Sequence, residues 1–600
     1  MKTSSLQLVG LLGWAATGIA GYADKAPNPA RDVTVQRRSS GIGFHRPANP
    51  DAPSTGPEPG DTKTTDPSAS CGPSGLPRLL DATLAELRNG LDSGLFTSVD
   101  LVQAYQARIA EVNAELHAVA ETSTEALAMA AERDAERRNG TARGPLHGIP
   151  VLLKANMGTA DGMGTTAGSA ALVGAAVAED STVAARLRRA GAVLLGKTHM
   201  SEWASGRDPW IPEGWSALGG QALGAYFRRQ NPSGSSSGSA VAVSVGLAWG
   251  ALGTETTTSI IVPAHVNNIV GIKPTVGLTS RHLVVPFSSH QDSVGPLART
   301  VKDAALLLSA IAGRDAADNY TDLIPAGTDF DFAAACTLSG LAGKRLGVVS
   351  NPEGLGSDGT QKPSLDAFEK ALDILREAGA TIVSNITFPG VNDLRDKSLQ
   401  YRILVADLAS DLPAYFARLK TNPHNITTIH DLRNFTHGSP AERHPQLGTY
   451  LWDDIVDTAP NNTSPDFWRF YQEALHLSGP QGLTGALTNY SLDALVMPSV
   501  WASLAASIIG TPVVSVPLGQ AGNNTVAVPL GGEINETTSM VAPGQPFGIG
   551  FAGPAFSEKA LIGMAYAFEQ QTQIRTKVKP IISPSTELVD VLRKRGADCA

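Results

Sequence analysis

The 600-residue sequence contains few cysteines and few charged residues. Its three cysteines, Cys71, Cys336 and Cys599, allow at most one intrachain disulfide, so the fold cannot depend on a cystine framework. Pairing of Cys71 with Cys599 is one option that the sequence leaves open. Charged residues make up 17% of the chain and hydrophobic residues 42%, a composition that indicates a globular protein with a large core.

Basic clusters and metal-ligand patterns are also missing. The formal net charge is −9, and no run of Lys and Arg provides the positive surface that a nucleic-acid groove requires. We therefore expect no nucleic-acid partner. The histidines show no metal-ligand spacing, and we expect neither a metal nor another cofactor; the histidines considered are His147, His199, His265, His282 and His290.

The apolar run near the N-terminus is too short to span a bilayer. It covers residues 6–19, follows Lys2 and precedes small residues at positions 21–23, an arrangement typical of a secretory signal peptide. An anchored or buried helix is the alternative. We predict that residues 1–23 form a signal peptide and that the mature protein is secreted, with no membrane association after signal removal.

Ten acceptor sequons for N-glycosylation support a secretory route. Each is an Asn followed by any residue except Pro and then Ser or Thr. They begin at Asn139, Asn319, Asn385, Asn425, Asn434, Asn461, Asn462, Asn489, Asn523 and Asn535. The sequence therefore predicts a secreted glycoprotein, and no feature of it indicates an oligomeric state.

Residues 24–75 are rich in Pro, Ser, Asp and Gly and lack apolar periodicity. Such a segment buries too little surface to offset its ordering entropy, so we predict that it is mobile. The Arg37-Arg38 pair within it is a candidate processing site, although a dibasic pair is more commonly just solvated charge.

From residue 76 the sequence alternates between patterns typical of helices and strands. Residues 79–94 and 98–121 have apolar residues at helical spacing, each segment opened by a capping Asp or Ser. Further on, short apolar runs such as "VLLGK" and "RLGVVS" alternate with helical patterns such as "TVKDAALLLSAIAG". This alternation predicts an α/β fold in one domain over 76–600. We expect an irregular, sequon-rich surface excursion near 391–479.

Two short motifs match known catalytic patterns without their structural context. Residues 191–198, "GAVLLGKT", fit the phosphate-binding loop, but the residues between the glycines read as a strand instead of a loop. Residues 234–238, "GSSSG", fit the nucleophile elbow of α/β-hydrolases with Ser236 as nucleophile, yet no hydrophobic strand precedes them. Composition alone would make the same Ser/Gly run a flexible linker. The elbow remains the weaker alternative: an esterase that uses Ser236.

Several longer motifs appear together between Leu79 and Gln573. They include "GIPVLLKANMGTADGMGTTAGSAAL", "RLRRAGAVLLGKTHMSEWA", "GWSALGG", "SGSSSGS", "GTETTTSIIVPA", "GIKPTVGLTSR" and "QDSVGPLARTVKDAALLL". In this order they resemble the amidase signature family of serine hydrolases. The resemblance implies an amidase signature fold, in which helices cover both faces of a large mixed β-sheet, and cleavage of linear amides of small molecules.

The resemblance also implies a Ser-Ser-Lys triad. Ser259 stands where the family has its nucleophile, Ser235 where it has the bridging serine after a cis peptide bond, and Lys154 where it has the general base. A lysine serves as a base only when neutral, and burial at the end of the apolar run "VLLK" would lower its pKa. The backbone amides of Thr256, Thr257, Thr258 and Ser259 would then form the oxyanion hole.

The sequence departs from the family pattern in two places, before the nucleophile and after the lysine. Thr257 and Thr258 precede the nucleophile where the family usually has Gly-Gly or Asp-Gly, and Ala155 follows Lys154 where the family usually has Asp. A β-branched Thr258 resists backbone conformations that glycine adopts freely, so the oxyanion hole is expected to be reshaped. A catalytically impaired binding protein on the same fold is therefore the main alternative to an active hydrolase.

Overall fold

The computed structural model describes residues 75–349, 361–530 and 538–598. The predicted signal peptide, residues 24–74, Arg37, Arg38, Cys71 and Cys599 lie outside these ranges. Cys336 lies inside them and is a free, partly buried thiol. Within the three ranges, no helix combines the length and the apolar character needed to cross a membrane.

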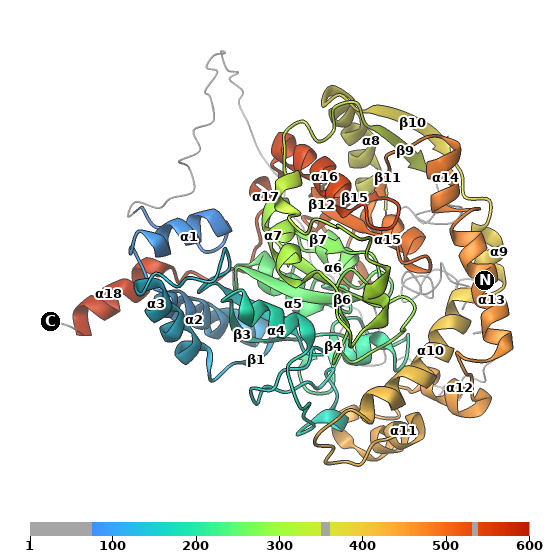
Figure 1. The fold of residues 1–600 in the computed structure, drawn as a ribbon, viewed down its shortest axis with the longest axis horizontal. Helices are drawn as coiled ribbons and strands as arrows, with labels where there is room; N and C mark the ends of the chain where they lie inside the picture. The colour runs from blue at the N-terminus through green and yellow to red at the C-terminus, as the bar shows by residue number, and fades with distance from the viewer. Residues whose placement is uncertain (1–74, 350–360, 531–537, 599–600) are drawn as a thin grey trace, which may run out of the picture.

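A mixed β-sheet forms the centre of the described part of the chain and has eleven strands there (Figure 1). In sheet order the strands are β1 (Val119–Thr122), β3 (Val193–Thr198), β2 (Pro150–Lys154), β6 (Gly250–Glu255), β8 (Ser293–Ala298), β7 (Val270–Lys273), β12 (Val513–Gln520), β15 (Pro546–Ala552), β11 (Ala494–Pro498), β9 (Arg345–Val349) and β10 (Thr381–Ile386).

Parallel pairing occurs in two parts of this sheet. Strand β2 runs parallel to β3 and β6, and β9 runs parallel to β10 and β11, whereas the pairs between β6 and β11 are antiparallel. Strands β2, β3 and β6 are buried along their whole length, which explains the apolar runs of β2 and β3. The segment 191–198, which fits the phosphate-loop pattern, contains the fully buried strand β3, as its apolar residues predict.

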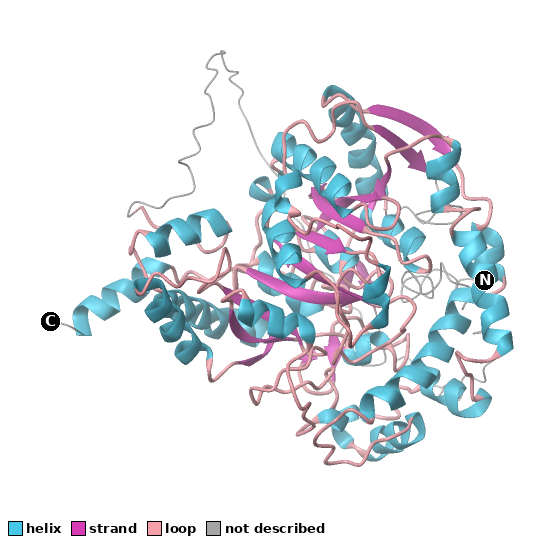
Figure 2. Cartoon of the chain, viewed as in Figure 1, coloured by secondary structure: helices cyan, strands magenta, loops and turns pink. Residues whose placement is uncertain are grey.

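Helices cover both faces of the sheet (Figure 2). One layer consists of α4 (Thr182–Arg189), α7 (Val301–Ile311), α16 (Glu558–Thr572) and α8 (Lys362–Glu377), which contact one another in that order. The other layer contains α5 (Ser237–Ser244), α6 (Ile261–Val266) and α15 (Ser499–Ser507). The predicted α/β architecture, a large mixed sheet with helices on both faces, is confirmed.

The first two helices begin with threonine caps, so the prediction of Asp or Ser caps is wrong in detail. Helix α1 (Leu84–Asp92) is capped by Thr83 and α2 (Ser98–Leu116) by Thr97, each in a capping box with an acidic residue three positions later. Threonine hydroxyls satisfy the free amides of the first turn as serine does. The helices themselves lie where the apolar spacing predicts them.

The prediction that 391–479 is irregular is also wrong, because this excursion is helical. It contains α9 (Val391–Asp396), α10 (Leu399–Phe416), α11 (Ile429–Gly438), α12 (Tyr450–Thr458) and α13 (Pro465–Ser478). Helix α10 is buried around most of its circumference, so its sequence lacks the one-sided apolar pattern that identifies a surface helix. It packs with α11, α12 and the loops that carry Trp203 and Phe287 in a hydrophobic cluster separate from the main core.

Candidate active site

Lys154 is the last residue of β2 and is completely buried. Its Nζ lies 2.7 Å from Ser235 Oγ, 2.8 Å from Thr254 Oγ1 and 3.3 Å from the Thr254 carbonyl oxygen. Burial lowers the pKa of Lys154 from 10.5 to about 7, although the carboxylates of Asp292 and Glu255 act in the opposite direction. Near neutral pH, much of Lys154 is therefore the uncharged amine that can accept a proton.

Two serine hydroxyls continue the hydrogen-bond chain from Lys154. Ser235 precedes α5 and follows a cis peptide bond after Gly234, and its Oγ donates to Ser259 Oγ over 3.1 Å. Ser259 lies in the connection between β6 and α6, where its carbonyl oxygen accepts the amide of Ser236. The structure thus brings together the three residues that sequence analysis singled out, although they come from different parts of the chain.

Glu255 and Ser503 hold the loop that carries Ser259. Glu255 Oε2 accepts the amides of Ile260 and Ile261 at 2.7 and 2.9 Å, and its Oε1 accepts the hydroxyl of Ser503 from α15. Thr256 Oγ1 donates to Asp292 from the other side. Charge-assisted hydrogen bonds to a buried carboxylate fix backbone position strongly, so this loop is held on both sides.

Thr258 adopts the left-handed conformation that glycine favours, with φ of +66°. Its amide donates to Ser503 Oγ over 2.9 Å, so in this conformation it is not a free oxyanion donor as sequence analysis expects. The amides of Thr256, Thr257 and Ser259 have no hydrogen-bond acceptor among the described residues. Threonine at 258 thus adopts a conformation that favours glycine, and the hydrogen bond from its amide to Ser503 removes one of the predicted donors.

Ala155 takes no part in charge balance around Lys154. It is buried, and its backbone pairs with Thr198 and Ala167. The negative charges that act on Lys154 belong instead to Asp292 and Glu255. Although position 155 has no carboxylate, two others act on Lys154: Glu255 at the end of β6 and Asp292 directly before β8.

The family model described as "Amidase" matches residues 100–562 of this sequence. The sequence is also 45% identical, over 538 residues, to the protein named "Putative amidase" from Arthroderma benhamiae, covering 86% of this chain and 90% of that protein. The chain belongs to the amidase family. It is an enzyme of the amide-hydrolysing class, and the fold and the motifs described above are those of the amidase signature.

Solved structures agree with this assignment. The native peptide amidase from Stenotrophomonas maltophilia is 38% identical, with a TM-score of 0.73 and coverage of 84% of this chain and 99% of that one. A second structure shows a peptide amidase, PAM, bound to the competitive inhibitor chymostatin, with the same identity and TM-score. The amidase described here is therefore similar to these enzymes over almost their whole length.

Ser236 has none of the features of a nucleophile. It is completely buried, its Oγ donates to the Thr254 carbonyl over 3.1 Å, and the amide of Thr254 donates back to it. No strand leads into it, because the residues before α5 form a loop. The hydroxyl of Ser236 instead ties α5 to β6 and so supports Thr254, which contacts Lys154.

Two spaces that share part of their lining lie at the loop that carries Ser259. The first has a volume of about 20 Å³, which is room for about one water molecule, and lies between the 256–259 loop, Gly234, Phe287 and Leu404 of α10. The second, of about 210 Å³, shares Ala204, Thr256 and Phe287 with the first. The excursion helix α10 thus forms part of the wall of the active site.

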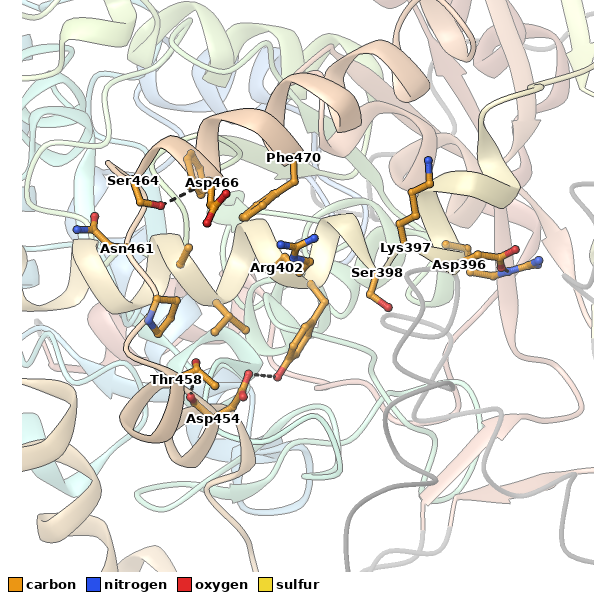
Figure 3. A pocket seen from close by; sticks show the side chains of 16 residues that line it. Asp396, Lys397, Ser398, Arg402, Asp454, Thr458, Asn461, Ser464, Asp466 and Phe470 are labelled. Carbon is orange, nitrogen blue, oxygen red and sulfur yellow. Dashed lines mark hydrogen bonds and ion pairs between the residues drawn. The ribbon is translucent and has the colours of Figure 1, made fainter.

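A larger cavity of about 920 Å³ lies elsewhere, between helices of the excursion (Figure 3). It is lined by residues of α9, α10, α12 and α13, among them Arg402 and Asp466, and Tyr401 donates to Asp454 across it. None of the predicted site residues lines it. Its size alone does not make it the reaction site, because the hydrogen-bond chain from Lys154 through Ser235 to Ser259 lies outside it.

Several residues that the site uses were not predicted from the sequence, among them Glu255, which holds the loop of Ser259. Thr254 bridges Lys154 and Asn156 through its Oγ1, Asp292 anchors Thr256, and Ser503 binds the amide of Thr258. Thr254 and Asp292 stand inside the motifs quoted above, so the motifs contained a signal for them. Ser503 stands in none. Within the described residues, no group of three His, Cys, Asp or Glu side chains is arranged to hold a metal ion.

Proposed function

We propose that this amidase cleaves the C–N bond of carboxylic acid amides through an acyl-serine intermediate. Ser259 is the nucleophile, Ser235 the proton relay and Lys154 the general base. The observation that supports this assignment is the continuous hydrogen-bond chain from the buried Lys154 through Ser235 to Ser259. A hydroxyl both donates and accepts, so the chain carries a proton in either direction.

In the first half of the reaction, Ser259 Oγ attacks the amide carbonyl carbon. Its proton moves to Ser235, whose own proton moves to neutral Lys154. When the tetrahedral intermediate collapses, the protonated lysine returns a proton through Ser235 to the leaving nitrogen, and the amine or ammonia departs. Water then attacks the carbonyl carbon of the acyl-enzyme while Lys154, through Ser235, takes up its proton. The proton returns to Ser259 Oγ as the acyl–oxygen bond breaks, which releases the carboxylic acid and free Ser259.

The oxyanion in this scheme is stabilised by the backbone amides of Thr256, Thr257 and Ser259. These three residues line the space over the nucleophile, and their amides have no acceptor among the described residues, whereas the amide of Thr258 donates to Ser503. One well-placed donor typically lowers the barrier by about 3 to 4 kcal/mol. The site therefore keeps donors for catalysis even without the glycine that the family usually has at 258.

We propose peptide amides as the substrate class, since the amidase shares 38% identity with a peptide amidase over 84% of its length.

We also propose that the protein is a secreted glycoprotein. Within the described ranges every predicted sequon asparagine is exposed except Asn462, which is buried and donates to Asp407. Removal of N-glycans by a glycosidase should shift the mass of the secreted protein, and glycan attached at Asn462 would contradict this arrangement.

Release of ammonia from an N-acetylated amino acid amide tests the mechanism. Ser259→Ala should reduce turnover to background, and Lys154→Ala should lower kcat by about 10²-fold or more, because the relay loses its base. Ser93→Ala, an exposed change at the end of α1, serves as the matched control and should behave as wild type. Turnover that survives Ser259→Ala would contradict the proposal, and a folded wild type without turnover would favour an impaired binding protein.

A further inference from the structure

The 210 Å³ cavity beside Ser259 contains polar groups that the protein itself leaves without partners. Asn156 is buried, and its Nδ2 donates to Thr254 Oγ1, but its Oδ1 has no hydrogen bond within the described residues. The hydroxyl of Tyr415 is likewise buried and without a partner there. Buried polar groups normally have partners, so two such groups around one cavity indicate a ligand that supplies them.

Asp411 adds a carboxylate to the same cavity. It stands one turn before Tyr415 on α10, and its Oδ2 accepts the amide of Ser289 over 2.6 Å. Burial and, after it, the neighbouring Asp407 carboxylate raise the pKa of Asp411 to about 7. Asp407 itself is engaged by Ser288, His290 and Asn462. Asp411 is therefore the carboxylate of this pair that faces the cavity.

The cations around the cavity do not neutralise Asp411. Arg281 forms a two-bond ion pair with Asp318, at 2.8 and 2.7 Å. Arg418 is exposed at the rim. Asp292, a further carboxylate in the wall, raises the pKa of Asp411 instead of lowering it. The interior of the cavity is thus an acceptor-rich, negatively polarised space.

The cavity is placed to receive part of a substrate held at Ser259. It shares Thr256 and Phe287 with the small space over the nucleophile. Its other wall is formed by the apolar residues 283–286, which suit the methylene groups of a side chain. At about 30 Å³ for each water molecule, its volume equals roughly seven waters, enough for one long side chain but not for a larger ligand.

We propose that this cavity binds the side chain on the acyl part of the amide substrate and selects side chains that end in a cation, with Asp411, Tyr415 and Asn156 as its polar partners. This assignment rests on the proposed function, because it places the substrate carbonyl at Ser259. An ammonium group would donate to the Asp411 carboxylate, the Tyr415 hydroxyl and the Asn156 carbonyl oxygen together. It would also relieve the repulsion between Asp411 and Asp407.

Calorimetric binding to the Ser259→Ala protein tests the assignment without turnover. The probes are Nα-acetyl-lysine amide and Nα-acetyl-norleucine amide, which differ only in the terminal ammonium, together with Nα-acetyl-glutamate amide. The lysine amide should bind about tenfold or more tightly than the norleucine amide, the ratio expected for hydrogen bonds to a charged group. Asp411→Asn should bring the ratio close to one while norleucine amide still binds, which shows that the variant is folded.

Tyr415→Phe, which keeps the shape and removes only the hydroxyl, should lower the lysine-to-norleucine ratio in part. Asp373→Asn, an exposed acid on α8 far from the cavity wall, is the matched control and should leave it unchanged. Equal binding of the two amides, no binding of either, a ratio unaffected by Asp411→Asn, or preference for the glutamate amide would each overturn the assignment.

Wild-type turnover separates this assignment from the proposed function. An enzyme that hydrolyses the lysine and norleucine amides with equal kcat/KM keeps the proposed function and overturns the assignment of the cavity. A protein that binds the lysine amide selectively through Asp411 but hydrolyses neither amide keeps the cavity assignment, and the proposed function fails.

Discussion

Replacing Lys154 by methionine should abolish amide hydrolysis and, at neutral pH, make the folded amidase more stable. Methionine is a flexible, uncharged side chain of similar length that adapts to buried sites. Lys154 is completely buried, and its position at the end of β2 places its amine in the core. The residue that the reaction needs is therefore one that burial disfavours in its charged form.

The size of the effect follows from the pKa of Lys154. Burial lowers it from 10.5 to about 7. At about 1.4 kcal/mol for each pH unit, this difference amounts to about 5 kcal/mol of stability that the charged amine removes below pH 7. The variant loses the contacts of Nζ with Ser235 Oγ and with both oxygens of Thr254. At about 1 kcal/mol for each hydrogen bond, a net gain of about 2 kcal/mol remains.

The sign of this difference depends on pH. Between pH 7 and 10.5 the unfolded chain holds a proton on Lys154 that the folded protein lacks, so rising pH stabilises the wild type. The advantage of Lys154→Met should be largest below pH 7, shrink by about 1.4 kcal/mol per pH unit above it, and reverse near about pH 8.5. Titrating groups that do not interact with Lys154 affect both proteins alike and cancel in the comparison.

Urea unfolding of wild type and Lys154→Met at pH 6, 7.5 and 9 measures this difference. The m-values must agree for the two proteins, so that the midpoints report stability alone. A variant that is less stable than wild type at pH 6, or a difference that does not change from pH 6 to pH 9, would refute the view that Lys154 is buried with a strongly lowered pKa.

Three further predictions concern activity and the buried contacts. The kcat/KM for a neutral amide should fall about tenfold for each pH unit below pH 7, because protonated Lys154 cannot act as a base; a flat profile from pH 5 to 8 would contradict this. Glu213 lines the space over Ser259, and burial raises its pKa to about 7 as well, so Glu213→Gln is the control and should show the same fall. Ser503→Ala leaves the Thr258 amide without its acceptor and should lower the free energy of unfolding by about 1 to 3 kcal/mol, measured by urea unfolding. Arg207→Met removes the buried ion pairs of Arg207 with Glu202 and Glu442 and should cost about 3 to 5 kcal/mol of stability; a loss below about 1 kcal/mol would show that this cluster is not needed.

The main fold could be predicted because its elements follow simple rules. Strands β2 and β3 are continuous apolar runs, and α7 and α8 show apolar residues at helical spacing after a capping or proline-containing turn. Helix α10 escaped prediction because it is buried on most sides. An amphipathic pattern arises only where one side of a helix faces water, so a fully packed helix leaves no such pattern in the sequence.

The site was predictable where motifs carried it. The resemblance pointed to Lys154, Ser235 and Ser259, and the structure places these side chains in one hydrogen-bond chain. Ser503 could not be predicted, since it lies 245 positions after Thr258 and meets it only when α15 packs beside α6. That the Thr258 amide is engaged could not be predicted either, because only the folded loop shows which amides remain free.

A covalent adduct on Ser259 tests the central claim most directly. Wild-type amidase treated with a serine-directed fluorophosphonate should gain the mass of one adduct, and peptide mapping should place it on Ser259. The adduct should vanish in Ser259→Ala and persist in Ser236→Ala, whose hydroxyl is buried against Thr254. An adduct that maps to Ser236, or wild type that hydrolyses amides without any labelling of Ser259, would contradict the account.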